Sequence, residues 1–265
     1  MSKRWALAAA LVVAAGLLPA SATADTVALT AGFDRRARLG GTTALQVGIR
    51  IDPAVVRSPP AEVRLLYPKS LGLFSSGLGL ATCRRSASEF EQVLIDGSRR
   101  SGCPANAVIG YGSVRGEVRL GSTELIPEIG AVTLLAGPVA RERLGLVALV
   151  HGQHPFGAQL AYAGDVGPAT APFGGELTFR LHQIPSLAGY AEIALTDLDF
   201  SIGSPRITYY DRSRGRSVPF KPDTIPLPDA CPRGGFPFRT RITFEDGTSA
   251  AAGTTVRCPR APAGR

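Results

Sequence analysis

The feature that most constrains the fold is an alternation of apolar and polar residues with a period of two. Within residues 43–52, Leu45, Val47, Ile49 and Ile51 alternate with Gln46, Gly48, Arg50 and Asp52. This spacing places the apolar side chains on one face of a β-strand. The same alternation recurs in residues 63–67, 114–120, 176–182 and 236–245. The chain is therefore predicted to contain several strands, each with one face buried.

Two segments add detail to this pattern. The alternation in 236–245 leads into Asp246-Gly247 and then residues 254–258, which together predict a C-terminal hairpin over 235–258. Residues 144–150 are instead apolar in both phases, which indicates a strand covered on both faces.

One strand changes phase along its length. In residues 191–200, the apolar side chains hold odd positions up to Leu195 and even positions from Leu198. A β-bulge near Thr196 restores the apolar side chains to the core, because a bulge inserts one extra residue. The same bulge directs Asp197 and Asp199 outward together.

Helical patterns are few. The residues Ser86-Ala87-Ser88-Glu89 have the form of a capping box, and they predict about two helical turns to Ile95, before Gly97. No long helical segment separates the strands, which disfavours parallel crossover units. We therefore predict an all-β fold, an antiparallel β-sandwich with one short helix.

A proline-rich segment precedes the hairpin. Residues 205–230 contain five prolines and little periodicity, so they are predicted as a crossing loop or a linker. A lone hairpin of this size is marginally stable by itself. We therefore expect residues 25–265 to form a single domain, with 205–230 crossing to the hairpin.

The first 24 residues have the pattern of an export signal. Lys3 and Arg4 precede an apolar run over 6–20, and small residues follow up to an expected cleavage site after Ala24. The run is shorter than the roughly 20 residues that a membrane-spanning helix needs. We expect a product that is secreted or associated with the cell envelope, without a transmembrane anchor after cleavage.

Four cysteines follow the predicted signal, at Cys83, Cys103, Cys231 and Cys258. Exported proteins retain disulfides, and four cysteines allow three pairings. We predict Cys83–Cys103 and Cys231–Cys258, because the second pair brackets the predicted hairpin. The first pair then closes a loop that contains the predicted helix. Neither spacing is that of a zinc knuckle.

Three short strings carry a family resemblance. They are Cys103-Pro104-Ala105-Asn106-Ala107-Val108-Ile109-Gly110-Tyr111-Gly112, Cys231-Pro232-Arg233-Gly234-Gly235-Phe236-Pro237-Phe238 and the closing Cys258-Pro259. The chain resembles uncharacterised secreted, disulfide-containing β-rich proteins of actinobacteria. The resemblance implies a β-rich exported protein and conveys no activity.

The positive charge has one local concentration. The full chain has a formal net charge of +8, and without Lys3 and Arg4 it has 27 cations and 21 anions, or +6. Arginine excess also follows from GC-rich codon usage, so the total alone does not identify a partner. The densest basic stretch, which predicts a loop for an anionic ligand, comprises Tyr209, Tyr210, Arg212, Arg214, Arg216 and Lys221. We expect this loop to bind an anionic envelope polymer or another exported protein. Nucleic acid is not an expected ligand, because the protein is predicted to lie outside the cytoplasm.

Catalytic motifs are largely missing from the sequence. It has no Gly-x-Ser-x-Gly, and Gly110-x-Gly112-x-x-x-Gly116 lies in a predicted strand instead of before a helix. Candidate metal ligands are His151, His154, His182, Asp197 and Asp199. Zinc suits the histidines and calcium the paired aspartates, which also resemble half of a glycosidase acid pair. The simpler interpretation is that these are solvated surface side chains, and we predict no cofactor.

Two function classes remain open. The first is an exported, non-catalytic β-sandwich with a binding or structural role at the cell envelope or outside the cell. The second is a secreted hydrolase or metal-assisted enzyme that joins His151 and His154 to Asp197 or Asp199 across strands.

Overall fold

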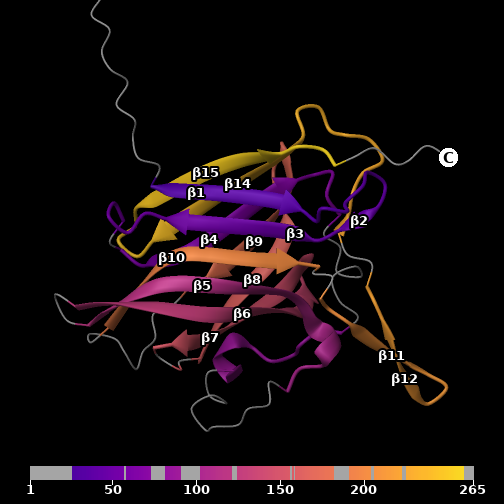
Figure 1. The fold of residues 1–265 in the computed structure, drawn as a ribbon, viewed down its shortest axis with the longest axis horizontal. Helices are drawn as coiled ribbons and strands as arrows, with labels where there is room; N and C mark the ends of the chain where they lie inside the picture. Colours follow the sequence, from indigo (N-terminus) through magenta and orange to yellow (C-terminus); the bar gives the residue numbers. More distant parts are fainter. Residues whose placement is uncertain are drawn as a thin grey trace, which may run out of the picture.

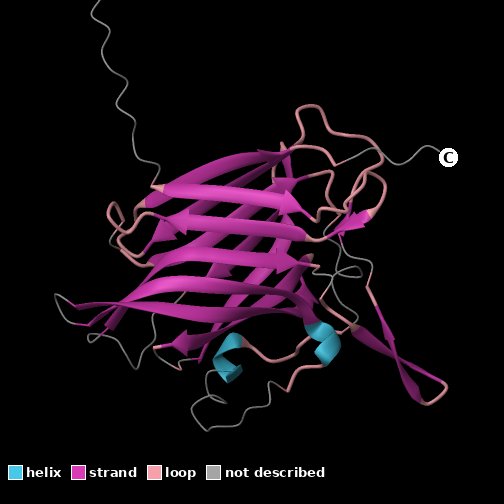
Figure 2. Cartoon of the chain, viewed as in Figure 1, coloured by secondary structure: helices cyan, strands magenta, loops and turns pink. Residues whose placement is uncertain are grey.

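The computed structural model describes residues 26–56, 58–72, 81–90, 102–120, 124–155, 157, 159–181, 191–203, 206–222 and 225–259. Their regular secondary structure is almost entirely β-strand, and every strand pairing in the sheets is antiparallel. The all-β, antiparallel prediction is therefore confirmed (Figure 2). The predicted export signal, residues 1–24, lies outside the described residues.

Eleven strands form one continuous sheet in the order β1-β3-β10-β5-β6-β7-β8-β9-β4-β14-β15. Their bounds are β1 Val27–Phe33, β3 Leu45–Ile51, β4 Pro60–Pro68, β5 Val108–Leu120, β6 Glu124–Ala140, β7 Arg143–His154, β8 Gln159–Pro168, β9 Phe173–Arg180, β10 Ala191–Ile202, β14 Phe236–Phe244 and β15 Ser249–Val256. Two smaller sheets pair β11 Tyr209–Ser213 with β12 Arg216–Phe220, and β13 Ile225–Pro226 with β2 Thr42–Thr43.

The large sheet folds over into two facing layers. In Figure 1, β1, β3, β10, β5 and β6 lie nearest the viewer, and β4, β9, β8 and β7 cross behind them. The edge strands β1 and β15 contact each other but share no hydrogen-bonded ladder, so the sheet is nearly closed. The sandwich therefore arises from a single bent sheet, with the core between its layers.

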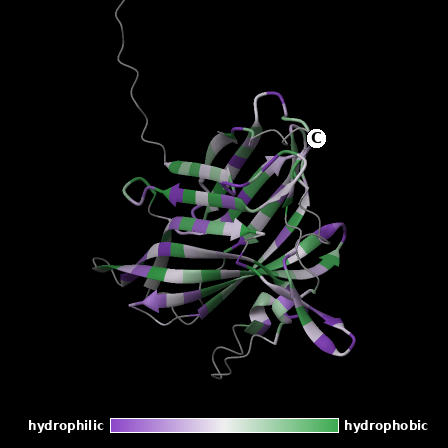
Figure 3. Cartoon of the chain, turned by 45° about the vertical axis from the view of Figure 1, so that its right-hand side comes forward, coloured by the Kyte–Doolittle hydropathy of each residue, from purple (hydrophilic) through white to green (hydrophobic). Residues whose placement is uncertain are grey.

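The core is built from the alternating apolar side chains. Leu45, Val47, Ile49 and Ile51 of β3 are all buried, and the residues between them face outward. The alternating bands along the strands in Figure 3 display the same period. Burial of these rows supplies most of the favourable free energy of such a fold.

A second apolar cluster lies on the outer face of the sheet. It contains Val147 of β7 with side chains from β6, from β8, from the segment that begins at Cys83, and from the 3-10 helix η1 (Ala105–Ala107). Its buried members are Cys83, Ala87, Phe90, Ala107, Leu135, Val147 and Ala161. The opposite face of β7 contributes Leu144, Leu146 and Ala148 to the main core. The prediction that residues 144–150 are covered on both faces is thus confirmed.

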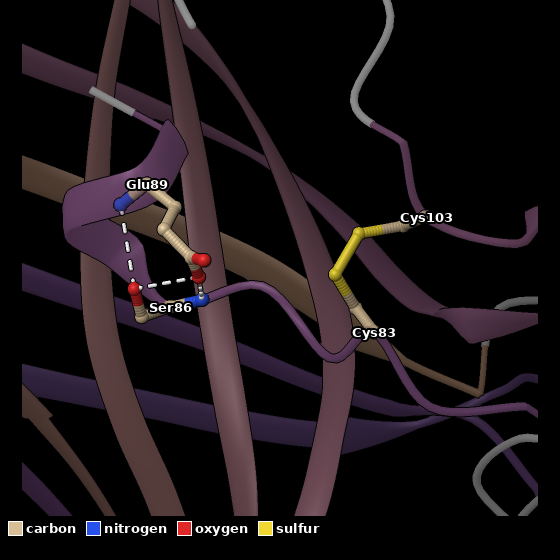
Figure 4. The surroundings of a disulfide bond; sticks show 4 residues. All are labelled: Cys83, Ser86, Glu89 and Cys103. Atoms are coloured by element: carbon tan, nitrogen blue, oxygen red, sulfur yellow. Dashed lines mark hydrogen bonds between the residues drawn. A yellow bond between two sulfur atoms is a disulfide. The ribbon is translucent and has the colours of Figure 1, made fainter. Parts of the chain in front are cut away.

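A short helix covers this cluster. Residues 87–90 are helical, with the predicted capping box at their start: the Ser86 N–H donates to Glu89 Oε2 at 2.6 Å, and the Glu89 N–H donates to Ser86 Oγ at 3.3 Å (Figure 4). The hydrogen bonds from Ser86 lower the pKa of the Glu89 carboxyl. The remainder of the predicted helix, up to Ile95, lies outside the described residues.

Both predicted disulfides are present, Cys83–Cys103 and Cys231–Cys258. The first holds the segment that carries the capped helix against the second cluster, and the other joins the open end of the β14–β15 hairpin. The predicted turn of that hairpin is also confirmed: Gly247 has a φ of 82°, and the Thr248 N–H donates to the Asp246 carboxylate at 2.9 Å.

The phase change in β10 has the predicted cause. The register between β10 and β5 shifts between Leu195 and Asp197, which leaves Thr196 as the extra residue. Phe200 is buried, and Asp197 lies on the outer face, where Arg50 Nε donates to its carboxylate at 3.0 Å. Arg50 is highly exposed, so this pair contributes little to stability.

The proline-rich segment 205–230 differs from a simple crossing loop. It contains the β11–β12 hairpin, which projects from the body of the protein (Figure 1). Beyond the hairpin, Ile225 and Leu227 are buried in the main core. Exposed strands with few apolar side chains have no clear period-two signal, which explains why the sequence pattern does not identify them.

Candidate functional site

The projecting hairpin places the predicted basic residues on two short strands. Residues of β11 and β12 pair in register from Tyr209 with Phe220 to Ser213 with Arg216. Arg214 and Gly215 form the two-residue turn, with φ values of 50° and 78°. Two consecutive positive φ angles are typical of the type I′ turn, whose twist matches that of the flanking strands.

Asn106 and Tyr209 anchor the base of this hairpin to the start of β5. Tyr209 is only 1% exposed, and its hydroxyl donates to the Val108 carbonyl at 2.9 Å. The Asn106 amide bonds both backbone groups of Tyr210: Nδ2 donates to the carbonyl at 2.7 Å, and Oδ1 accepts from the N–H at 3.0 Å. The rings of Tyr209 and Phe220 pack edge to face. The base is therefore held at several points.

Lys221 also contacts the protein itself. Its ammonium donates to the Ile207 carbonyl at 3.1 Å and to the Thr208 hydroxyl at 2.8 Å. Of the six residues predicted for an anionic ligand, Tyr209 and Lys221 thus secure the hairpin. Tyr210, Arg212, Arg214 and Arg216 remain exposed beyond its base.

The exposed arginines surround the tip. Arg212 shares a face of the hairpin with Tyr210, because both lie at even positions of β11, whereas Arg216 pairs with Ser213 on the opposite face. Arg214 occupies the turn itself. In the described part of the chain, none of these three guanidinium groups has an ion-pair partner. Their charge is therefore directed to solvent on several sides.

The free edges of the hairpin are poor templates for another strand. The backbone N–H and carbonyl of Tyr210 point away from β12, and both are hydrogen-bonded to the Asn106 side chain. They are therefore not available to pair with another strand. Pro219, directly opposite, has no N–H to donate at the other edge. Proline and charged residues commonly protect exposed strand edges. The hairpin thus offers its side chains, more than its backbone, for recognition.

Burial of two phenols predicts a loss of stability in alkali. Burial raises the pKa of both Tyr67 and Tyr209 to about 12. Between pH about 10 and 12, the unfolded chain loses these protons before the folded chain, so the free energy of unfolding should fall as the pH rises. Urea midpoints measured at pH 9 and pH 11.5 check this.

The substitutions Tyr67→Phe and Tyr209→Phe remove the ionisable groups. Each should reduce the fall in the urea midpoint between pH 9 and pH 11.5. Tyr210→Phe, which removes an exposed phenol, is the matched control. Equal declines in the unmodified protein and in both buried-site variants would contradict the expectation.

Four of the five candidate metal ligands, His151, His154, Asp197 and Asp199, share a sheet face but do not meet. Asp197 and His154 lie in one cross-strand row, and Asp199 and His151 lie in the next. In both rows, β5 and β6 separate the aspartate from the histidine, a distance of three strand spacings or about 14 Å. His182 lies outside the described residues. Across the described ranges, no group of three or more His, Cys, Asp or Glu side chains is arranged to hold a metal ion.

The contribution of Asn106 was not predicted from the sequence. Asn106 and Tyr210 are 104 positions apart, and no local pattern connects them. An ion-pair network on the outer face was also missed: Arg143 bonds Asp165 and Glu176, and Arg180 bonds Asp165 at 3.1 Å. These partners come from β7, β8 and β9, so only the strand order brings them together.

Comparisons of the chain with protein-family models, with curated proteins and with solved structures found no match. Within the described residues, no helix combines the length and the apolar character that crossing a bilayer requires.

Proposed function

We propose that this chain is an exported, non-catalytic β-sandwich protein that binds an acidic polymer of the cell envelope through the tip of its β11–β12 hairpin. The observation that carries the proposal is the exposure of Arg212, Arg214 and Arg216 on an anchored support, with no ion-pair partner in the described structure. The N-terminal export pattern and two disulfides support an oxidising compartment.

The arrangement of the arginines favours a polymer over a single small anion. Each guanidinium group can form two parallel hydrogen bonds with a carboxylate or phosphate. The three groups lie on two faces and at the turn, so they do not converge on one point. A chain with repeated negative charges can contact all three, whereas a single anion cannot.

A hairpin variant tests the proposal. It combines Arg212→Thr, Arg214→Asn and Arg216→Thr; threonine suits the strand positions, and Asn-Gly suits the turn. Retention on immobilised polygalacturonate, which carries carboxylates, and on immobilised polyphosphate is measured at several NaCl concentrations. We expect the unmodified protein to bind, to be released by salt, and to bind at least one polymer about tenfold more tightly than the variant does.

The matched control removes three exposed arginines at other places, by Arg36→Ser, Arg84→Ser and Arg115→Thr. This control should retain most of the binding, because it preserves the hairpin and has the same net charge as the hairpin variant. Equal losses in the two triple variants, or no retention of the unmodified protein on either polymer, would overturn the proposed role of the hairpin.

A further inference from the structure

A second group of exposed arginines lies on the outer face of β4 and β14, away from the hairpin. Arg64 of β4 stands directly opposite Arg241 of β14, and Arg239 lies two residues from Arg241 on the same face. We call these three residues the β14 patch. All three are exposed, and the residues next to them in sequence are buried.

The cross-strand pair of Arg64 and Arg241 is unfavourable for the isolated protein. Side chains directly opposite in an antiparallel pair lie about 5 Å apart at Cβ, and like charges there are destabilising. Violations of such local rules are expected mainly at functional sites. Glu62 pairs with Arg64 but not with Arg241, so the arrangement points to a ligand that supplies negative charge to Arg241.

The acids near the patch on this outer face are already engaged, one of them by Arg64 itself and two by arginines outside the patch. Glu62 accepts a hydrogen bond from Arg64 Nε at 2.6 Å, which raises the pKa of Arg64. Asp165 bonds Arg143 and Arg180, and Glu176 bonds Arg143 at 3.1 Å. Among the described residues, neither Arg239 nor Arg241 has an ion-pair partner. Local acids thus leave the charge of β14 uncompensated.

The neighbouring edge strand leaves these guanidinium groups uncovered. On β15, Gly253 stands opposite Arg239, and Ala251 stands opposite Arg241. Both residues are exposed and short, and among the described residues no strand is hydrogen-bonded to the other edge of β15, which β1 contacts without a ladder. The patch is therefore an open surface that an extended molecule can approach along β14.

We propose that the β14 patch is a second contact site for the same acidic polymer, with one of its anionic groups held between Arg64 and Arg241. This inference rests on the proposed function of the hairpin. Arg239 and Arg241 are about 7 Å apart along the strand, and Arg64 is one strand spacing away, so the patch contacts more than one repeat of the polymer. Two contact sites on one chain strengthen binding, because the second contact forms within a tethered complex.

Four proteins test the inference on polygalacturonate and polyphosphate: the unmodified chain, the hairpin variant, Arg239→Thr/Arg241→Thr, and the combination. The double variant should bind about fivefold more weakly, and its plot of log affinity against log salt should be shallower by roughly one to two units. Arg84→Ser/Arg115→Thr, which removes two exposed charges elsewhere, is the control and should bind more tightly than the double variant.

The outcomes separate the two proposals. If Arg239→Thr/Arg241→Thr binds as tightly as its control while the hairpin variant does not, the second site is wrong and the proposed function stands. If the hairpin variant binds as tightly as its own control, the proposed function fails, whatever the β14 patch does.

Urea unfolding independently tests whether Arg64 and Arg241 repel each other. In low salt, Arg241→Thr should unfold at an equal or higher urea concentration than the unmodified protein, because it removes the repulsion from Arg64. Added polymer should raise the midpoint of the unmodified protein more than that of this variant. A lower midpoint of the variant without polymer, or equal shifts with polymer, would overturn the inference.

Discussion

Replacing Phe236 with alanine is expected to lower the free energy of unfolding by about 3–5 kcal/mol, as for other large-to-small changes of buried aromatic residues. Phe236 is fully buried at the start of β14, and its ring packs edge to face on Phe33 of β1, with 5.0 Å between centroids. Strands β1 and β14 share no ladder, so side chains alone hold them together here. The substitution therefore opens a cavity and weakens the closure of the sheet.

Urea unfolding checks this expectation, with Val55→Ala as the control. Val55 is exposed, so its truncation should change the free energy of unfolding by less than about 0.5 kcal/mol. A double-mutant cycle of Phe33→Leu and Phe236→Leu should give a coupling of about 0.5–1.5 kcal/mol, which is typical of aromatic pairs. If Phe236→Ala lowers the free energy of unfolding by less than about 1 kcal/mol, the prediction is wrong, and the neighbouring side chains fill the cavity.

Removing the disulfides should have an effect of similar size. Each bond closes a loop of 20 or 27 residues, and the chain-entropy model assigns roughly 3 kcal/mol to each. We expect the free energy of unfolding to fall by roughly 3 kcal/mol in Cys83→Ser/Cys103→Ser and by a similar amount in Cys231→Ser/Cys258→Ser. Cys83 belongs to the outer cluster and Cys258 packs against the main core, so the two losses should add.

The variant without any cysteine should therefore lose about 6 kcal/mol, a large fraction of the stability of a typical domain. The measurement is urea unfolding of the two paired variants and of the four-serine variant, with reduced unmodified protein as the comparison. An unchanged midpoint for either paired variant would contradict the contribution assigned to that bond.

Most of the core strands were predictable, because one buried face imposes a period of two on the sequence. Strands β3, β4 and β14 follow this period in their burial. The bulge at Thr196 was also predictable, since one inserted residue moves the apolar side chains from odd to even positions within a single strand. Strand β6 had no clear pattern, because apolar side chains such as Leu125 and Ile129 also occupy its exposed face, and an extra residue between Ala136 and Val139 shifts its register with β7.

The candidate site was less predictable than the core. The local sequence shows that residues 209–221 are basic and aromatic, but it does not distinguish anchors from exposed groups. Tyr209 and Tyr210 are adjacent in sequence, yet one is 1% and the other 50% exposed. The contacts from Asn106 and Val108 make this difference, and both residues lie about 100 positions earlier in the chain.

The sequence by itself determined the strand class, the capping box and the hairpin turn, and it favoured the local pairing of the cysteines among three alternatives. Each of these depends on interactions over a few residues or on burial of one strand face. Only the tertiary structure decided that one continuous sheet forms both layers, that Arg64 faces Arg241, and that His151 and His154 stay apart from Asp197 and Asp199. These features depend on strand order and register, which arise from packing across the whole sheet.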